Sequence, residues 1–274
     1  MGMFEDYFED LAKRNEKPAA DDYMGEDGLM YCGKCHTPKQ TRVMAFGKER
    51  IIGCNCKCES EAYAKRKEDE KQKEFNEKVK RLKKLGFTEA RLAEYTFDND
   101  DGSNEELSKI AKKYADEFHK FRNEGIGLLM YGNVGGGKTF MASAIANELI
   151  AKGVPCSVTS FPHLANLDIQ KRQDYINNMN DFDLIVIDDL AVERNTEYMN
   201  EMVYTVIDSR YRAKLPIIVT TNLTGDEIKA ATDVNKKRVY SRLFEMTFPV
   251  EVTHSDRRRA ILKDRYKTMK ELLT

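Results

Sequence analysis

The chain has 274 residues, with 45 lysines and arginines against 46 aspartates and glutamates, and a formal net charge of −1. Hydrophobic residues make up 41% of it, which is enough for a globular core, whereas 16 glycines and 6 prolines exclude collagen-like and proline-rich classes. The near-zero net charge offers no general argument for nucleic-acid binding, although it is compatible with local basic patches.

The first ten residues, MGMFEDYFED, are acidic and lack the basic start and apolar core of a secretory signal. No apolar stretch approaches the ~20 residues that a membrane-spanning helix needs. We therefore expect an intracellular protein that has no membrane partner.

Five of the six cysteines lie close together in the first quarter of the chain. Cys32 and Cys35 form a C-x-x-C pair, and CNCKC follows at 54–58. Two close pairs of thiolates are typical of a tetrahedral structural Zn²⁺ site, so we expect Cys32 and Cys35 to bind together with either Cys56 and Cys58 or Cys54 and Cys56. An iron–sulfur cluster or reduced free thiols are the alternatives. Cys156 lies in a strand pattern and is interpreted as an ordinary core residue.

Charge is concentrated in particular segments of the sequence. Residues 1–29 hold nine acids and three bases, whereas 65–84 hold fifteen charged residues, ten of them basic. The run 59–85 contains neither glycine nor proline, and its apolar stripe is narrow (Phe75, Val79 and Leu82). This pattern predicts a solvated connecting helix rather than a core helix.

Apolar strands alternate with helical patterns from Glu105 onward. Strands are expected at 126–132, 155–160, 183–188 and 216–222, with helices between them. This order predicts an α/β fold with a parallel sheet covered on both faces. We divide the chain into a small zinc-binding domain (1–60), a charged helical linker (61–95) and an α/β domain (96–274).

The stretch GNVGGGKT follows one of these strands and precedes a helix, which is the context of a phosphate-binding loop. Its backbone N–H groups are expected to surround a β-phosphate, Lys138 to neutralise the β- and γ-phosphates, and the Thr139 hydroxyl to bind Mg²⁺. The expected nucleotide-binding residues are Gly132, Asn133, Val134, Gly135, Gly136, Gly137, Lys138, Thr139 and Phe140.

Two further strands end in polar residues that suit the same site. LIVIDD places Asp188 and Asp189 at a strand end, where Asp188 is expected to hold Mg²⁺ and Asp189 to polarise the attacking water. Asp189 is one methylene shorter than the glutamate common at this position, which predicts slow hydrolysis or dependence on a partner. Asn222 ends the strand PIIVTTN and is expected to orient water; a strand-end turn residue is the alternative.

Two basic clusters occur late in the chain, KKRVYSR (236–242) and HSDRRR (254–259). Each is either a solvated surface or a source of arginine that reaches the γ-phosphate, in cis or from a neighbouring subunit. Arg242 is the favoured residue for the role in trans.

Taken together, the cysteine cluster, the charged helix and the motifs GNVGGGKT, LIVIDDLAVER and IIVTTN resemble the DnaC/DnaI-type replicative helicase loaders, which are AAA+ ATPases. The resemblance runs from about Met30 to Arg259. It implies that Arg242 is an arginine finger, that Arg257 (or Arg258) is a second sensor arginine, and that Asn222 is the first sensor. It also implies ATP, Mg²⁺ and Zn²⁺ as cofactors.

The resemblance further implies an ATP-dependent loader that acts during replication initiation in the bacterial cytoplasm and is encoded by the bacterium or by a phage. Its implied partners are a hexameric replicative helicase, single-stranded DNA and further copies of its own ATPase domain. Its ATP hydrolysis is expected to be slow and stimulated by a partner or by single-stranded DNA. Two other functions fit less well: an IstB-type transposition helper, and a zinc-dependent nucleic-acid-binding regulator with a vestigial ATPase.

Overall fold

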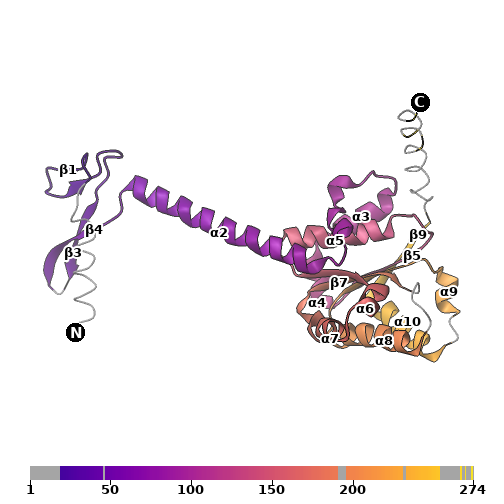
Figure 1. Cartoon of the computed structure of the whole chain (residues 1–274). Helices are drawn as coiled ribbons and strands as arrows, with labels where there is room; N and C mark the ends of the chain where they lie inside the picture. The colour runs from indigo at the N-terminus through magenta and orange to yellow at the C-terminus, as the bar shows by residue number, and fades with distance from the viewer. Residues whose placement is uncertain are drawn as a thin grey trace. The chain divides into compact units, whose positions relative to one another are not determined.

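The computed structural model of the chain describes residues 19–45, 47–190, 196–230 and 233–253, together with Tyr266, Met269 and Leu273. The chain divides into two compact units, Met1–Asn76 and Glu77–Thr274 (Figure 1). Among the described residues, no helix is long and apolar enough to cross a bilayer.

The first unit is built from two small antiparallel pairs of strands. β1 (Tyr23–Met24) pairs with β2 (Met30–Tyr31), and β3 (Gln40–Ala45) pairs with β4 (Lys48–Gly53). The buried apolar side chains described in this unit are Cys32, Ala45 and Cys56. Because two of these three are cysteines, apolar packing among the described residues of this unit is small, and small domains with little apolar core are commonly stabilised by a covalent or metal cross-link.

A five-stranded sheet forms the centre of the second unit. Its order is β6-β7-β8-β5-β9 and every neighbouring pair is parallel. The strands are β5 (Gly127–Gly132), β6 (Cys156–Ser160), β7 (Leu184–Leu190), β8 (Ile217–Thr221) and β9 (Thr247–Val252). β7 and β8 are buried along nearly their whole length, as expected for a parallel sheet with helices on both faces.

Alternate residues of the strands point into two separate hydrophobic clusters. Leu184 and Val186 pack in the cluster that includes α3 and α5, whereas Ile185 and Ile187 pack in the cluster that includes α6, α8 and α10 (Figure 1). The sequence-based prediction of an α/β fold with a covered parallel sheet is therefore confirmed. The α-helices of this unit are α3 (Glu105–Asp116), α4 (Phe118–Glu124), α5 (Lys138–Ala151), α6 (Phe161–Asn166), α7 (Ile169–Asn178), α8 (Glu197–Arg212), α9 (Gly225–Lys229) and α10 (Val234–Met246).

The long helix α2 (Lys57–Gly86) ends inside the second unit's core. Val79 and Leu82 pack against the cluster that includes α3 and α5. Gly86 allows close contact, since a Cβ there would lie 2.4 Å from the carbonyl oxygen of Cys156. Phe87 then forms an isolated parallel bridge with Val158 of β6. One side of the last turns of the expected connecting helix is therefore packed against the core, and the other sides remain exposed.

Three short 3₁₀ helices complete the described elements: η1 (Ala90–Glu94), η2 (Phe97–Asn99) and η3 (Met179–Asp181). η1 is tied to α5 because the Asn147 amide donates to the carbonyl oxygens of Leu92 at 3.0 Å and Tyr95 at 2.8 Å. This places the segment 90–95 beside the helix that begins at the phosphate loop.

Candidate nucleotide and metal sites

The phosphate loop connects the end of β5 to the start of α5. Three glycines have a positive φ that side chains disfavour: Gly132 at 115°, Gly135 at 80° and Gly137 at 93°. At Gly132 a Cβ would also lie 2.6 Å from the carbonyl oxygen of Val252 in β9. The loop therefore needs glycine at these points to bring its backbone N–H groups to the N-terminus of α5, where anions bind well.

Lys138, the first residue of α5, is held by the loop itself. Its ammonium donates to the carbonyl oxygens of Gly132 at 2.8 Å and Asn133 at 2.6 Å, and only 5% of the residue is exposed. Carbonyl oxygens fix the position of the ammonium without supplying a full negative charge. The loop thus holds a buried positive charge at the place where the sequence predicts the β- and γ-phosphates.

Asp188, at the end of β7, joins three elements. One oxygen, Oδ1, accepts hydrogen bonds from the hydroxyls of Thr139 at 2.8 Å and Thr220 at 2.6 Å. Burial raises the pKa of Asp188, while the two hydroxyl donors act in the opposite direction. A carboxylate beside the Thr139 hydroxyl, next to a phosphate loop, is the ligand pair that Mg²⁺ uses in this class of site.

Asp189 and Asn222 meet at the same sheet edge. Asp189 has a φ of 54°, and the β7–β8 register shifts between Ile187 and Leu190. Its backbone N–H donates to Thr220 Oγ1 at 2.9 Å, and Asn222 Nδ2 donates to Asp189 Oδ1 at 3.3 Å. The register shift turns the Asp189 side chain away from the regular path of β7 and toward Asn222.

Thr220 is a site residue that the sequence reasoning missed. It donates to Asp188 and accepts from the backbone of Asp189, so it positions both acids. The only sequence signal was its place in the TTN run that ends a buried strand.

The remaining loop residues lie as follows. Asn133 donates through its backbone to the carbonyl oxygen of Val252 at 3.0 Å, and Val134 is half exposed. A Cβ on Gly136 would lie 2.5 Å from a methyl of Val252. Phe140 packs its ring against Tyr95, with centroids 5.2 Å apart.

Arg242 is engaged within α8 and α10. Its Nη2 lies 2.8 Å from Asp208 Oδ1, and its guanidinium carbon lies 4.7 Å from the Tyr204 ring centroid and 5.7 Å from that of Tyr211. Among the described residues, its polar and ring contacts are with α8 and none is with the acids of β7. The structure therefore does not bring Arg242 to this chain's own phosphate loop. Arg257 and Arg258 lie outside the described residues.

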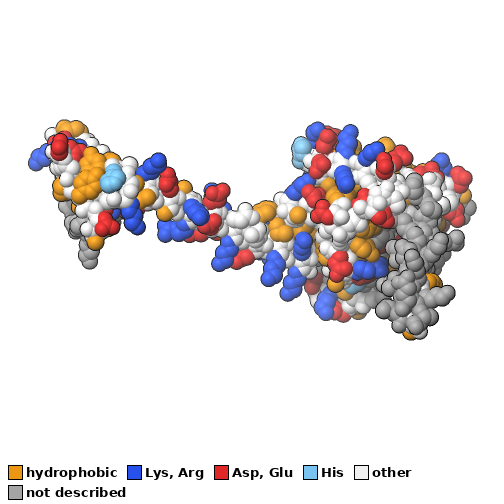
Figure 2. Space-filling view, turned by 90° about the horizontal axis from the view of Figure 1, so that it is seen from above, with side chains coloured by type: hydrophobic (Ala, Val, Ile, Leu, Met, Phe, Trp, Pro, Cys, Tyr) orange, Lys and Arg blue, Asp and Glu red, His pale blue; other side chains and the backbone are white. Residues whose placement is uncertain are grey.

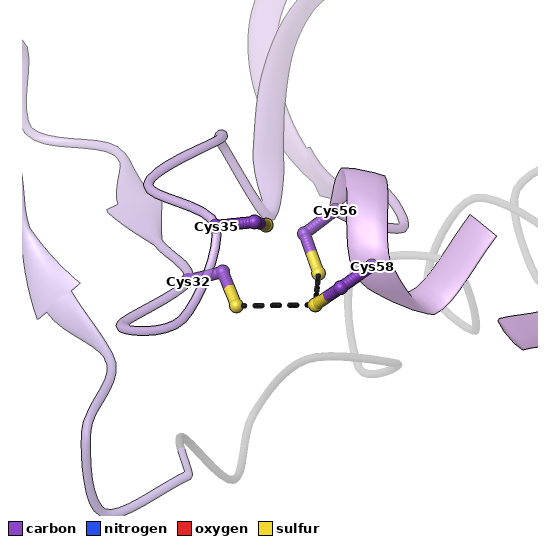
Figure 3. Close-up of side chains that lie close together, drawn as sticks. All are labelled: Cys32, Cys35, Cys56 and Cys58. Atoms are coloured by element: carbon purple, nitrogen blue, oxygen red, sulfur yellow. Dashed lines mark hydrogen bonds between the residues drawn. The ribbon is translucent and has the colours of Figure 1, made fainter. Parts of the chain in front are cut away.

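Four of the five clustered cysteines come together in the first unit. The sulfur atoms of Cys32, Cys35, Cys56 and Cys58 all lie within 4.8 Å of one another (Figure 3). Cys58 Sγ is 3.6 Å from Cys32 Sγ and 3.2 Å from Cys56 Sγ. In a zinc tetrahedron with bonds of about 2.3 Å, sulfurs lie about 3.8 Å apart, so the cluster has the composition and approximate size for zinc.

Cys54 takes a different position. Its thiol donates to the carbonyl oxygen of Pro38 at 3.6 Å, and it is not among the four converging sulfurs. His36 is also separate from the cluster, since its Nδ1 lies 3.2 Å from Tyr23 Oη. Cys156 is fully buried in β6, and burial raises the pKa of its thiol, as befits a core residue.

Thr37 organises the thiol cluster and was not singled out from the sequence. Its hydroxyl oxygen lies 3.1 Å from Cys35 Sγ and accepts from the backbone N–H of Lys57 at 2.8 Å. The contact with Thr37 is the largest cause that lowers the pKa of Cys35 to about 5, whereas burial raises the pKa of Cys56. Zinc binds the thiolate form of cysteine, so the contact with Thr37 acts in the direction that favours zinc binding by Cys35.

Comparison with known proteins adds named relatives. The replicative helicase loader DnaI of Bacillus subtilis (strain 168) is 28% identical over 201 residues, covering 66% of this chain and 64% of that protein. The replicative helicase loader DnaC of Escherichia coli (strain K12) is 25% identical over 150 residues, covering 52% and 58%. The chain thus spans about three fifths of the length of these curated relatives.

Solved structures support the fold. A crystal structure of DnaI superposes with a TM-score of 0.53 at 22% identity, covering 65% of this chain and 99% of that one. A putative primosome component from Streptococcus pyogenes serotype M3 gives a TM-score of 0.51 at 20% identity, covering 64% and 96%.

The family model described as IstB-like ATP binding protein matches residues 60–259, which include the phosphate loop, Asp188 and Asn222. Since this match spans well over half of the chain, the protein belongs to the IstB-like family of ATP-binding proteins, with an AAA+ fold.

Proposed function

We propose that this protein is an ATP-dependent loader that places a hexameric replicative helicase on single-stranded DNA during replication initiation. The observation that carries the proposal is the presence, in one chain, of a phosphate loop joined to Asp188 and a separate four-cysteine unit. The relatives named as helicase loaders support it.

In this proposal the second unit binds ATP with Mg²⁺. Lys138 neutralises the β- and γ-phosphates, while Thr139 and Asp188 hold the metal, which supplies charge neutralisation at the phosphates. Asp189, oriented by Asn222, polarises the attacking water. Because Asp189 is short and already accepts a hydrogen bond from Asn222, intrinsic hydrolysis is slow and a partner or single-stranded DNA stimulates it.

The site is completed by a neighbouring copy of the chain. Arg242 is the proposed arginine finger, with Arg257 or Arg258 as the second sensor. Asp208 and the two tyrosine rings hold the Arg242 guanidinium in a defined position, which suits a residue that must meet a neighbour's γ-phosphate. ATP binding then favours an assembled state with a different affinity for the helicase.

The first unit contains the proposed helicase-interaction domain (1–60), and the helical linker (61–95) and the ATPase domain (96–274) follow along the chain. Zn²⁺ on Cys32, Cys35, Cys56 and Cys58 holds this unit together in place of a large apolar core. Its four sulfur ligands leave no open coordination position, so the metal's role is structural.

A transposition helper ATPase of the IstB type is the second candidate, and membership of the IstB-like family favours it. Such helpers usually lack a cysteine-rich N-terminal domain, which is present here. The third candidate, a zinc-dependent regulator with a vestigial ATPase, is opposed by the intact set of Lys138, Thr139 and Asp188.

The first test measures binding and loading of the replicative helicase encoded in the same genome. The wild-type protein should bind the helicase and, with ATP, increase the amount retained on circular single-stranded DNA. Lys138→Ala should bind the helicase but load it at least tenfold less, because the phosphates lose their buried positive charge. Lys152→Ala, at the other end of α5, is the matched control. Absence of helicase binding by the wild-type protein in every nucleotide state would contradict the loader function.

Completion of the site in trans predicts a specific kinetic pattern. Arg242→Ala should bind a fluorescent ATP analogue normally but hydrolyse ATP at least tenfold more slowly. A mixture of Arg242→Ala and Lys138→Ala should recover part of the turnover, since one copy supplies the loop and the other the arginine. Arg212→Ala, which removes the other arginine paired with Asp208, is the control and should retain turnover. If the mixture is as inactive as each variant alone, completion of the site in trans is rejected.

The choice of zinc ligands is tested by metal content. Cys56→Ser should lose the bound zinc and lower the thermal stability of the first unit, because it removes one of the four converging thiols. Cys54→Ser should retain a full equivalent of zinc, as measured by mass spectrometry of the desalted protein. Equal loss of zinc in both variants would show that the second pair is wrongly assigned.

A further inference from the structure

The second half of α2 carries a concentrated positive charge. Its first twenty residues, 57–76, balance six acids with six bases, whereas 77–84 contain one acid, Glu77, and five bases. We call these five bases the basic segment of α2: Lys78, Lys80, Arg81, Lys83 and Lys84. All five are exposed, and Figure 2 shows lysine and arginine side chains gathered along this helix.

This charge is not neutralised within the described part of the protein. None of the five basic side chains has an ion-pair partner among the described residues, although Glu77 is three and four positions from Lys80 and Arg81. Elsewhere the same spacing does give pairs, as in Lys109 with Glu105 and Lys152 with Glu148. With respect to the described part of the chain, the basic segment therefore presents a positive surface that no ion pair neutralises.

Helix stability explains only part of the segment. Lys83 and Lys84 lie in the last turn, where positive charge interacts favourably with the helix dipole. Lys78, Lys80 and Arg81 lie too early for that effect, which is confined to the terminal turn. Their like charges repel one another, so the concentration of bases weakens the isolated helix.

Packing fixes the direction in which the charge points. Val79 and Leu82 of the same turns pack in the hydrophobic cluster that includes α3 and α5. Val79 and Leu82 occupy one side of the helix, and their packing prevents the helix from rotating freely. The exposed bases are therefore held on its remaining sides. The surface is a rigid part of the ATPase unit, so little order has to be created when a ligand binds.

We propose that the basic segment of α2 binds the phosphate backbone of single-stranded DNA. It spans about 9 Å along the helix, and its long side chains extend its reach to about three phosphates of one strand. Contacts between lysine or arginine and phosphates release counterions and are independent of base sequence. The choice of single-stranded DNA among polyanions rests on the proposed loader function, whereas the position of the surface rests on the charges described above.

The test compares two triple variants that each remove two lysines and one arginine. Lys78→Gln, Lys80→Gln and Arg81→Gln alter the basic segment, whereas Lys65→Gln, Arg66→Gln and Lys71→Gln alter the balanced half of the same helix. Glutamine keeps the helix propensity of the replaced side chains. Circular dichroism and thermal unfolding establish that both variants remain folded.

Binding of each full-length protein to a fluorescein-labelled oligothymidine is measured by anisotropy over a series of salt concentrations. The basic-segment variant should bind at least tenfold more weakly at low salt, and its slope of log K against log salt should fall by about 2, since each lost phosphate contact removes about 0.7. The control variant should stay within about twofold of the wild type, because its bases are balanced by neighbouring acids.

Equal weakening in both variants would overturn the proposal, because it would indicate a general charge effect. Unchanged binding in both, or no oligonucleotide binding by the wild type, would also overturn it and would leave an acidic protein segment as the ligand of this surface. This binding assay contains no helicase, so its outcome is separate from that of the helicase-binding experiment. If the protein fails to bind the helicase but the basic-segment variant loses DNA binding, the loader function is rejected and the DNA-binding surface is retained.

Discussion

The shared hydrogen bonding of Asp188 is the interaction on which the rest of the ATPase unit depends. Its Oδ1 accepts from Thr139 at the start of α5 and from Thr220 near the end of β8, while Asp188 itself ends the regular part of β7. This is possible because parallel strands bring their carboxyl ends to one edge. The order of the strands, the glycine-containing phosphate loop and the position of Asp188 therefore depend on one another. Burial of both faces of the sheet holds these parts in place.

Helix α2 serves different purposes at its two ends. Its first turn contains Cys58, one of the four cysteines with converging sulfurs, so the helix begins in a unit whose described residues bury few apolar side chains. Its last turns contribute Leu82 and Gly86 to the core of the ATPase unit. Between these ends the helix is exposed, and its stability there depends on helix-forming residues rather than on packing.

The sequence was informative where function depends on residues close together in the chain. The glycines, Lys138 and Thr139 are adjacent, and the apolar run before Asp188 identifies a strand, so the loop between a strand and a helix and the strand that carries Asp188 could be predicted. Thr220 could not, because its contact with Asp188 joins residues 32 positions apart. Likewise, the spacing of CNCKC allowed two ligand pairs, and only the start of α2 brings Cys58 rather than Cys54 to the cluster. The packing of Gly86 against Cys156 could not be predicted from the sequence either, since it depends on a backbone contact between residues 70 positions apart.

The central claim is that Lys138, Thr139 and Asp188 form one site for ATP with Mg²⁺, and calorimetric titration with ATP tests it most directly. The wild-type protein should bind ATP at least tenfold more tightly with Mg²⁺ than in its absence. Asp188→Asn keeps the size of the side chain and an oxygen for the two hydroxyls but removes the charge that attracts the metal. The account predicts that this variant binds ATP with little dependence on Mg²⁺; an unchanged dependence would contradict it.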